Sequence, residues 1–208
     1  MDAARCINNM SKDNPFLIIP QDANGKAILS DFGSITPDRS ASETVKSSHP
    51  TKLDIAGGTI TGPSDGVNGN SPEDCIDCVT AYTNGTVTDS VWLRDLKLVS
   101  GAANQQQAIT IKGGCSSCVI ENCTFEGKFK RAEVVLGDYN IYWPVDKMRG
   151  IVLRKLSTTD GKPVRVWCMW SERPTIQGGN VELVYSWIPA YFYKCLFGIL
   201  RWIRGRES

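Results

Sequence analysis

A short phrase recurs along this chain, and its recurrence constrains the fold more than any other feature. Residues 120–127 read IENCTFEG, and looser copies begin at Ile55, Leu93 and Leu153. The copies begin 27 to 38 residues apart, an irregular spacing within the range of coiled repeats. We therefore expect rungs of equal length that are joined by loops of varying length.

Each copy alternates apolar and polar residues, which is typical of a β-strand that buries one face. Alternation turns Ile120, Cys123 and Phe125 inward. One such unit cannot bury its apolar side alone, whereas parallel copies stacked in register form a continuous core. The pattern thus predicts a β-solenoid in which Leu93, Ile120 and Leu153 share one buried column.

These phrases resemble the rung signatures of the right-handed parallel β-helix of the pectate-lyase-like superfamily. Gly-Gly-Thr-Ile-x-Gly and Ile-x-Asn-Cys-x-Phe-x-Gly are common there, and the resemblance covers roughly residues 50–185. It implies an all-β chain with a single right-handed parallel β-helix. That superfamily includes lyases, hydrolases, phage tailspikes and inert virion parts, so the resemblance does not select an activity.

The chain divides into three expected segments: an N-terminal arm or cap (1–50), the β-helix (51–186) and a C-terminal helix (187–208). The first is rich in proline, serine, aspartate and asparagine, with short strands only at 16–19 and 27–29. It either folds back over the first rung or reaches a neighbouring subunit. Further strands on other faces of the coil are expected at residues 78–82, 108–112, 134–136 and 164–168.

The C-terminal segment breaks the β pattern, because its apolar residues recur at helical spacing. A helix of roughly 24 Å would be too short to cross a hydrocarbon core of about 30 Å. Its wide apolar arc must therefore bury against the solenoid end, a partner groove or a membrane surface. The expected partner-binding residues are Trp187, Tyr191, Phe192, Leu196, Phe197, Ile199, Trp202 and Ile203.

The outer face of the repeat carries the candidate catalytic groups. The shared register stacks Arg94, Glu121 and Arg154 on neighbouring rungs, which predicts a ladder of alternating charge. Glycoside hydrolysis needs two carboxyl groups about 5 to 9.5 Å apart, and Asp95 and Glu121 are the pair that the register places on adjacent rungs of this face. Their cationic neighbours favour the ionised form of both, which argues against hydrolysis.

Cysteine spacing suggests a possible metal site. Cys75-x-x-Cys78 and Cys115-x-x-Cys118 have the spacing of zinc ligands. The alternative is that these cysteines are small buried hydrophobes that fill the rungs, and we expect no metal.

One aromatic segment differs in character from the strands. Tyr139, Tyr142 and Trp143 lie beside Asp138 and Asn140, ahead of a proline. We expect a lateral loop that stacks on a sugar ring or packs against a partner.

Composition excludes several classes of function. Lysine and arginine number 23 against 22 aspartates and glutamates, so no global field attracts nucleic acid. No phosphate loop or dinucleotide fingerprint is present, and the single histidine, His49, has no evident nucleophile beside it, so we expect no cofactor. No apolar run of signal-peptide length follows Met1, which predicts synthesis in the cytoplasm without a signal peptide.

From these observations we expect a non-catalytic structural or interaction protein. It looks similar to phage virion components, associated with a tail or capsid, that dock with other proteins or with copies of themselves. A polysaccharide lyase or glycoside hydrolase is the alternative, and a peripheral membrane protein held by residues 187–208 is a second alternative.

Overall fold

The computed structural model describes residues 14–80, 88–113, 115–138, 148–169 and 171–185. Within these ranges the regular elements are β-strands and one short 3-10 helix, η1 (Val67–Gly69). The strands are β1 (Leu17–Ile18), β2 (Lys26–Ser30), β3 (Ser34–Ile35), β4 (Glu43–Ser48), β5 (Lys52–Thr61), β6 (Asp74–Val79), β7 (Thr88–Val99), β8 (Gln107–Lys112), β9 (Cys115–Glu121), β10 (Thr124–Glu126), β11 (Ala132–Asp138), β12 (Ile151–Thr158), β13 (Val164–Cys168), β14 (Thr175–Gly179) and β15 (Val181–Tyr185).

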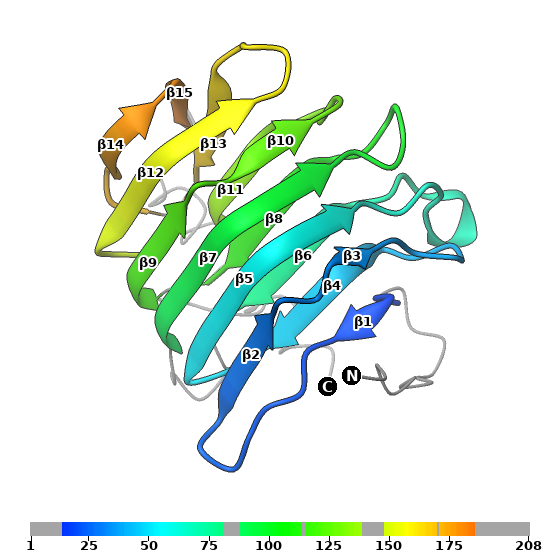
Figure 1. Cartoon of the computed structure of the whole chain (residues 1–208), viewed down its shortest axis with the longest axis horizontal. Helices are drawn as coiled ribbons and strands as arrows, with labels where there is room; N and C mark the ends of the chain where they lie inside the picture. Colours follow the sequence, from blue (N-terminus) through cyan, green and yellow to red (C-terminus); the bar gives the residue numbers. More distant parts are fainter. Residues whose placement is uncertain (1–13, 81–87, 114, 139–147, 170, 186–208) are drawn as a thin grey trace, which may run out of the picture.

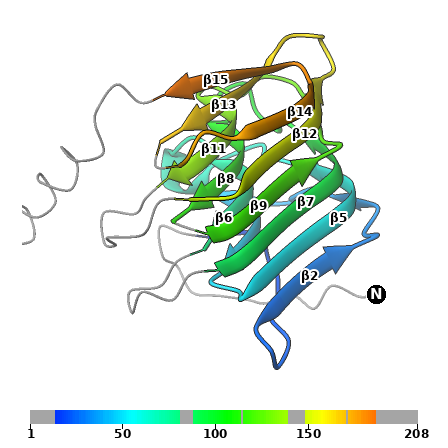
Figure 2. The same ribbon diagram turned by 90° about the vertical axis from the view of Figure 1, so that its left-hand side faces the viewer.

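The strands form two stacked sheets, and within each sheet every pairing between these strands is parallel. Sheet A has the order β1-β4-β6-β8-β11-β13-β15, and sheet B has the order β10-β12-β9-β7-β5-β2, with β14 beside β12 and β3 beside β5. Along the chain, each strand of sheet A from β1 to β13 is followed by one or two strands of sheet B, so the chain winds between the sheets (Figures 1 and 2). The described chain is therefore all-β, with an arrangement compatible with a solenoid.

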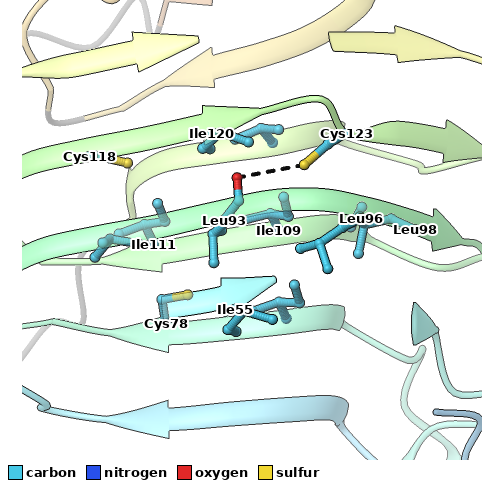
Figure 3. Close-up of a cluster of buried hydrophobic side chains, with 14 of the residues drawn as sticks. Ile55, Cys78, Leu93, Leu96, Leu98, Ile109, Ile111, Cys118, Ile120 and Cys123 are labelled. Atoms are coloured by element: carbon cyan, nitrogen blue, oxygen red, sulfur yellow. Dashed lines mark hydrogen bonds between the residues drawn. The ribbon is translucent and has the colours of Figure 1, made fainter. Parts of the chain in front are cut away.

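The core lies between the two sheets and consists of aligned columns. In sheet B, Ile55 pairs with Leu93, Leu93 with Ile120, and Ile120 with Leu153. All four side chains are fully buried, and Figure 3 shows Ile55, Leu93 and Ile120 on successive strands. The predicted column of Leu93, Ile120 and Leu153 is thus confirmed. Sheet A supplies the facing column of Val45, Ile76, Ile109, Val134 and Val166.

A second column marks a bend across sheet B. Equivalent positions on successive strands all adopt left-handed backbone conformations, with φ between 49° and 76°: Asp31, Gly57, Asp95, Asn122, Lys155 and Gly178. Glycine, asparagine and aspartate tolerate this conformation best, and they occupy five of these six positions. The side-chain amide of Asn122 donates to Asp95 Oδ1 at 3.0 Å, which links neighbouring strands along the bend.

The expected segments can be compared with the strands directly. The short strands expected at 16–19 and 27–29 coincide with β1 and β2, which pair with β4 and β5. The described part of the segment expected as an arm or cap thus contributes β1 and β4 to sheet A, and β2 and β3 to sheet B. The strands expected at 78–82, 108–112, 134–136 and 164–168 overlap β6, β8, β11 and β13, all in sheet A. The C-terminal helix expected at 187–208 lies outside the described residues.

Candidate functional site

The predicted carboxylate pair lies on the outer face of sheet B, but each member already has a structural partner. Asp95 occupies the bend, with φ of 56°, and accepts the hydrogen bond from Asn122. Glu121 lies one position earlier in the shared register and forms an ion pair with Arg154. The two carboxylates therefore link neighbouring strands of sheet B.

The predicted charge ladder forms only in part. Glu121 and Arg154 pair as expected, whereas Arg94 turns to the other side. Its Nε and Nη2 atoms donate to the two carboxylate oxygens of Asp54, at 3.2 and 2.9 Å. Arg94 also lies 5.7 Å from the ring centroid of Trp92. The sequence pattern missed Asp54, although this residue is on the same outer face one strand away.

The four cysteines considered as zinc ligands are buried and free. The Cys75 thiol donates to the carbonyl oxygen of Val99 at 3.5 Å. A hydrogen bond with Cys115, together with burial, raises the pKa of the Cys118 thiol, and burial also raises that of Cys78. All four side chains belong to the hydrophobic core between the sheets. Among the described residues, the group with metal-binding geometry contains none of them.

The remaining expected sites fall outside the described residues. These are the possible glycan-stacking residues Tyr139, Tyr142 and Trp143, and the C-terminal set Trp187, Tyr191, Phe192, Leu196, Phe197, Ile199, Trp202 and Ile203. They stay predictions.

The site that sequence reasoning missed lies on sheet A, on the side away from the core. It arises because strand alternation is interrupted near the start of β4 and β6. The Thr44 hydroxyl donates to the Thr61 carbonyl at 2.6 Å, and Cys75 reaches Val99, so both side chains point toward the ends of β5 and β7. The next residues, Val45 and Ile76, also enter the core.

Where two successive residues face the core, the residue before them and the residue after them both face outward. The outward residues are Glu43 and Lys46 in β4, and Asp74 and Asp77 in β6. These four residues are nonetheless buried, with exposed fractions between 0% and 8%. We call Glu43, Lys46, Asp74, Asp77, Gln107, Thr110 and Lys112 the sheet A ionic cluster.

Asp77 is the centre of this cluster. Its Oδ2 atom lies 3.2 Å from Lys46 Nζ and 2.9 Å from Lys112 Nζ. Lys46 Nζ is also 3.5 Å from Glu43 Oε1. Across the neighbouring strand, Thr110 Oγ1 donates to Asp74 Oδ1 at 2.5 Å. Strands β4, β6 and β8 thus contribute one connected polar network.

The network has strongly perturbed electrostatics. Burial, reinforced by the charge of Asp77, raises the pKa of Asp74 well above its usual value, which favours its neutral form. For Lys112, burial alone would lower the pKa, but the charges of Asp77 and Asp74 outweigh it and raise the pKa. The cluster therefore combines a carboxyl group that tends to hold a proton with a firmly charged ammonium group.

Geometry allows the cluster to hold a positive charge. Glu43, Asp74 and Asp77 each offer an oxygen, and these oxygens lie within 4.8 Å of one another. Carboxylate oxygens are ligands for hard cations. With no exposed surface at Asp74 or Asp77, a large substrate cannot reach them in this conformation.

A weak signal of this cluster is present in the sequence. Glu43-x-x-Lys46, Asp74-x-x-Asp77 and Gln107-x-x-Thr110 share one spacing, and Glu43 pairs with Asp74 in the sheet. Strict alternation would have placed the first and last residue of each motif on opposite faces. The interruption that brings them together is visible only in the structure.

No helix of the described residues is long and apolar enough to cross a membrane. No protein-family model matches this chain, and no match was found among curated proteins or solved structures.

Proposed function

We propose that this chain is a single right-handed parallel β-helix that serves as a non-catalytic structural or interaction module within a larger assembly. The continuous columns of sheets A and B support one solenoid, since each coil buries its apolar face against the next. The resemblance to the pectate-lyase-like β-helices of phage virions suggests a tail or capsid as the setting. This family and this setting are parts of the proposal.

The observation that supports this proposal most strongly is the distribution of the carboxyl groups between the surface and the interior. A glycoside hydrolase needs an accessible acid and a second accessible carboxylate. Here the described carboxyl group with a strongly raised pKa, Asp74, is fully buried. On the accessible face of sheet B, Asp54, Glu121 and Glu126 are each paired with a cation. This division favours a structural role over a catalytic one.

The last coil offers a docking surface for such a module. Ile176 on β14, together with Val184 and Tyr185 on β15, is 40% to 48% exposed. Strand β15 ends the order of sheet A, and β14 pairs with β12 alone. Exposed apolar residues on terminal strands favour contact with another chain.

Two assays on the full chain separate the proposal from its enzymatic alternative. Incubation with a panel of acidic and neutral polysaccharides should release no oligosaccharide. Release that is lost in Glu121→Gln or Asp74→Asn would establish the enzyme instead. These variants test the exposed pair and the buried cluster separately.

Association tests the structural role directly. Sedimentation velocity over a range of concentrations should show self-association, or co-sedimentation with the assembly made in the same cell. The double variant Ile176→Ser/Tyr185→Ser should raise the dissociation constant of this association at least tenfold. Ile28→Ser, which removes an exposed side chain from the opposite end of sheet B, should leave it unchanged. Equal loss in both variants would argue against docking through the last coil.

A further inference from the structure

An exposed tryptophan lies on the outer face of sheet B. Trp92 on β7 is 46% exposed, although Val91 and Leu93 on either side of it are fully buried. It pairs with Val119 on β9, which is followed in the sheet by Val152 on β12, and both valines are partly buried. Neighbouring strands are about 4.8 Å apart, so these three side chains form an apolar stripe about 10 Å long across adjacent strands (Figure 1). We call Trp92, Val119 and Val152 the Trp92 stripe.

The indole of Trp92 is held beside an ordered ion pair. The guanidinium carbon of Arg94 lies 5.7 Å from the centroid of the indole ring. The same guanidinium donates through Nε and Nη2 to both carboxylate oxygens of Asp54, at 3.2 and 2.9 Å. Such a forked pair fixes the orientation of the arginine, and the cation–π contact favours one position of the ring. Because these side chains are ordered before binding, a ligand that contacts them loses little further conformational entropy.

The ionic side chains beside the Trp92 stripe are paired with one another. Arg94, Glu121 and Arg154 lie two positions after its members on the same three strands. Arg94 pairs with Asp54, and Arg154 pairs with Glu121. These described pairs present equal positive and negative charge, so they favour a ligand without net charge. A polyanion would have to compete with Asp54 and Glu121 for the two arginines.

The apolar area of the stripe is small for a protein partner. Stable protein interfaces bury roughly 800 Å² on each side around an apolar centre, and one exposed tryptophan with two partly buried valines supplies far less. On the other side of the stripe, Ser90 and Ser117 pair in register at outward positions. A matching ligand therefore has an apolar face and hydrogen-bonding groups at its edges. A sugar ring has both, because its C–H bonds can meet the partly negative face of the indole while its hydroxyl groups point outward.

We propose that this face of sheet B binds a short uncharged oligosaccharide, with one sugar ring stacked on Trp92 and the chain running across β7, β9 and β12. The ion pairs on one side of the stripe and the serine hydroxyls on the other bond the hydroxyl groups of the sugar. The sugar is held and not cleaved, because Asp54 and Glu121 are each engaged by an arginine. The proposal is independent of docking through the last coil, which uses other strands.

The test measures binding of defined oligosaccharides to the full chain by saturation-transfer NMR. The uncharged probes are cellohexaose, maltohexaose and mannohexaose, and hexamannuronate is the acidic counterpart of mannohexaose. At least one uncharged probe should bind, and hexamannuronate should bind more weakly than that probe. Trp92→Ala should raise the dissociation constant about tenfold or more, because the stacking surface is lost. Trp92→Phe keeps an aromatic face and should cause a smaller loss.

A matched variant separates stacking on Trp92 from a general effect of losing a tryptophan. Trp167→Ala removes a partly buried tryptophan from the outer side of sheet A and should leave the dissociation constant unchanged, with circular dichroism confirming the fold of each variant. Failure of all three uncharged probes to bind the wild type would overturn the proposal. Binding that persists in Trp92→Ala, or tighter binding of hexamannuronate, would overturn it as well. Reduced self-association in Trp92→Ala, without sugar binding by the wild type, would identify a protein interface instead.

Discussion

Replacing Asp74 by asparagine should change how stability depends on pH. Asparagine matches the shape of the neutral carboxyl group but cannot ionise. The folded pKa of Asp74 is raised above the unfolded value of 3.8, so the folded state holds a proton that the unfolded state releases. Its stabilising contribution is therefore complete below the unfolded pKa and is lost as pH rises toward the folded pKa.

The magnitude follows from proton linkage. One proton held only by the folded state makes the free energy of unfolding fall by about 1.4 kcal/mol per pH unit between the two pKa values. For a chain of 208 residues, this corresponds to roughly 3–6 °C in Tm per pH unit. Asp74→Asn lacks this dependence on pH. The free energy of unfolding of the variant, relative to that of the wild type, should therefore rise by about 1.4 kcal/mol per pH unit between the two pKa values and then level off.

Urea unfolding monitored by circular dichroism from pH 4 to pH 9 would measure this difference. The ionic strength is held constant across this range. Thr110→Val is the control, because it removes the hydrogen bond to Asp74 Oδ1 but keeps the titrating group, and should retain the slope of the wild type. A constant difference between Asp74→Asn and wild type would show that Asp74 is ionised in the folded state and would refute the reasoning.

Four further single substitutions test the fold by urea unfolding. Ile120→Ala empties part of the central column and should cost about 2–5 kcal/mol; a loss below about 1 kcal/mol would contradict the buried column. Gly57→Asn should be neutral or stabilising by up to about 1 kcal/mol, since asparagine tolerates the left-handed backbone at the bend and reduces the conformational entropy of the unfolded chain. Gly58→Asn should destabilise the fold, because its Cβ would lie 2.7 Å from the ring of Phe32. The reverse order of stability would refute the bend. Glu133→Ala removes the carboxylate that lies 2.9 Å from Arg165 and should cost about 2–3 kcal/mol. This is below the range for fully buried pairs, because Arg165 is partly exposed. Replacing both partners should cost less than Glu133→Ala alone.

The sequence predicted the core of sheet B closely. Leu93, Ile120 and Leu153 could be aligned because alternation is a property of a single strand, and the repeat fixes which residues face inward. The outward position of Glu121 and its pairing with Arg154 followed from the same register. No pattern in the phrase, however, shows that Arg94 turns toward Asp54, because two rotamers of one side chain reach opposite neighbours.

Local sequence therefore determined the inward columns and the strands, since backbone periodicity and side-chain hydrophobicity act within a few residues. Tertiary structure alone decided the ionic cluster. Thr44 and Cys75 turn inward because they bond to carbonyl groups at the ends of β5 and β7, and this breaks the alternation on which sequence reasoning depends. Glu43 and Asp74 are thereby brought beside Asp77 and two lysines. Their burial depends on contacts between strands, so no single strand encodes it, and burial raises the pKa of Asp74.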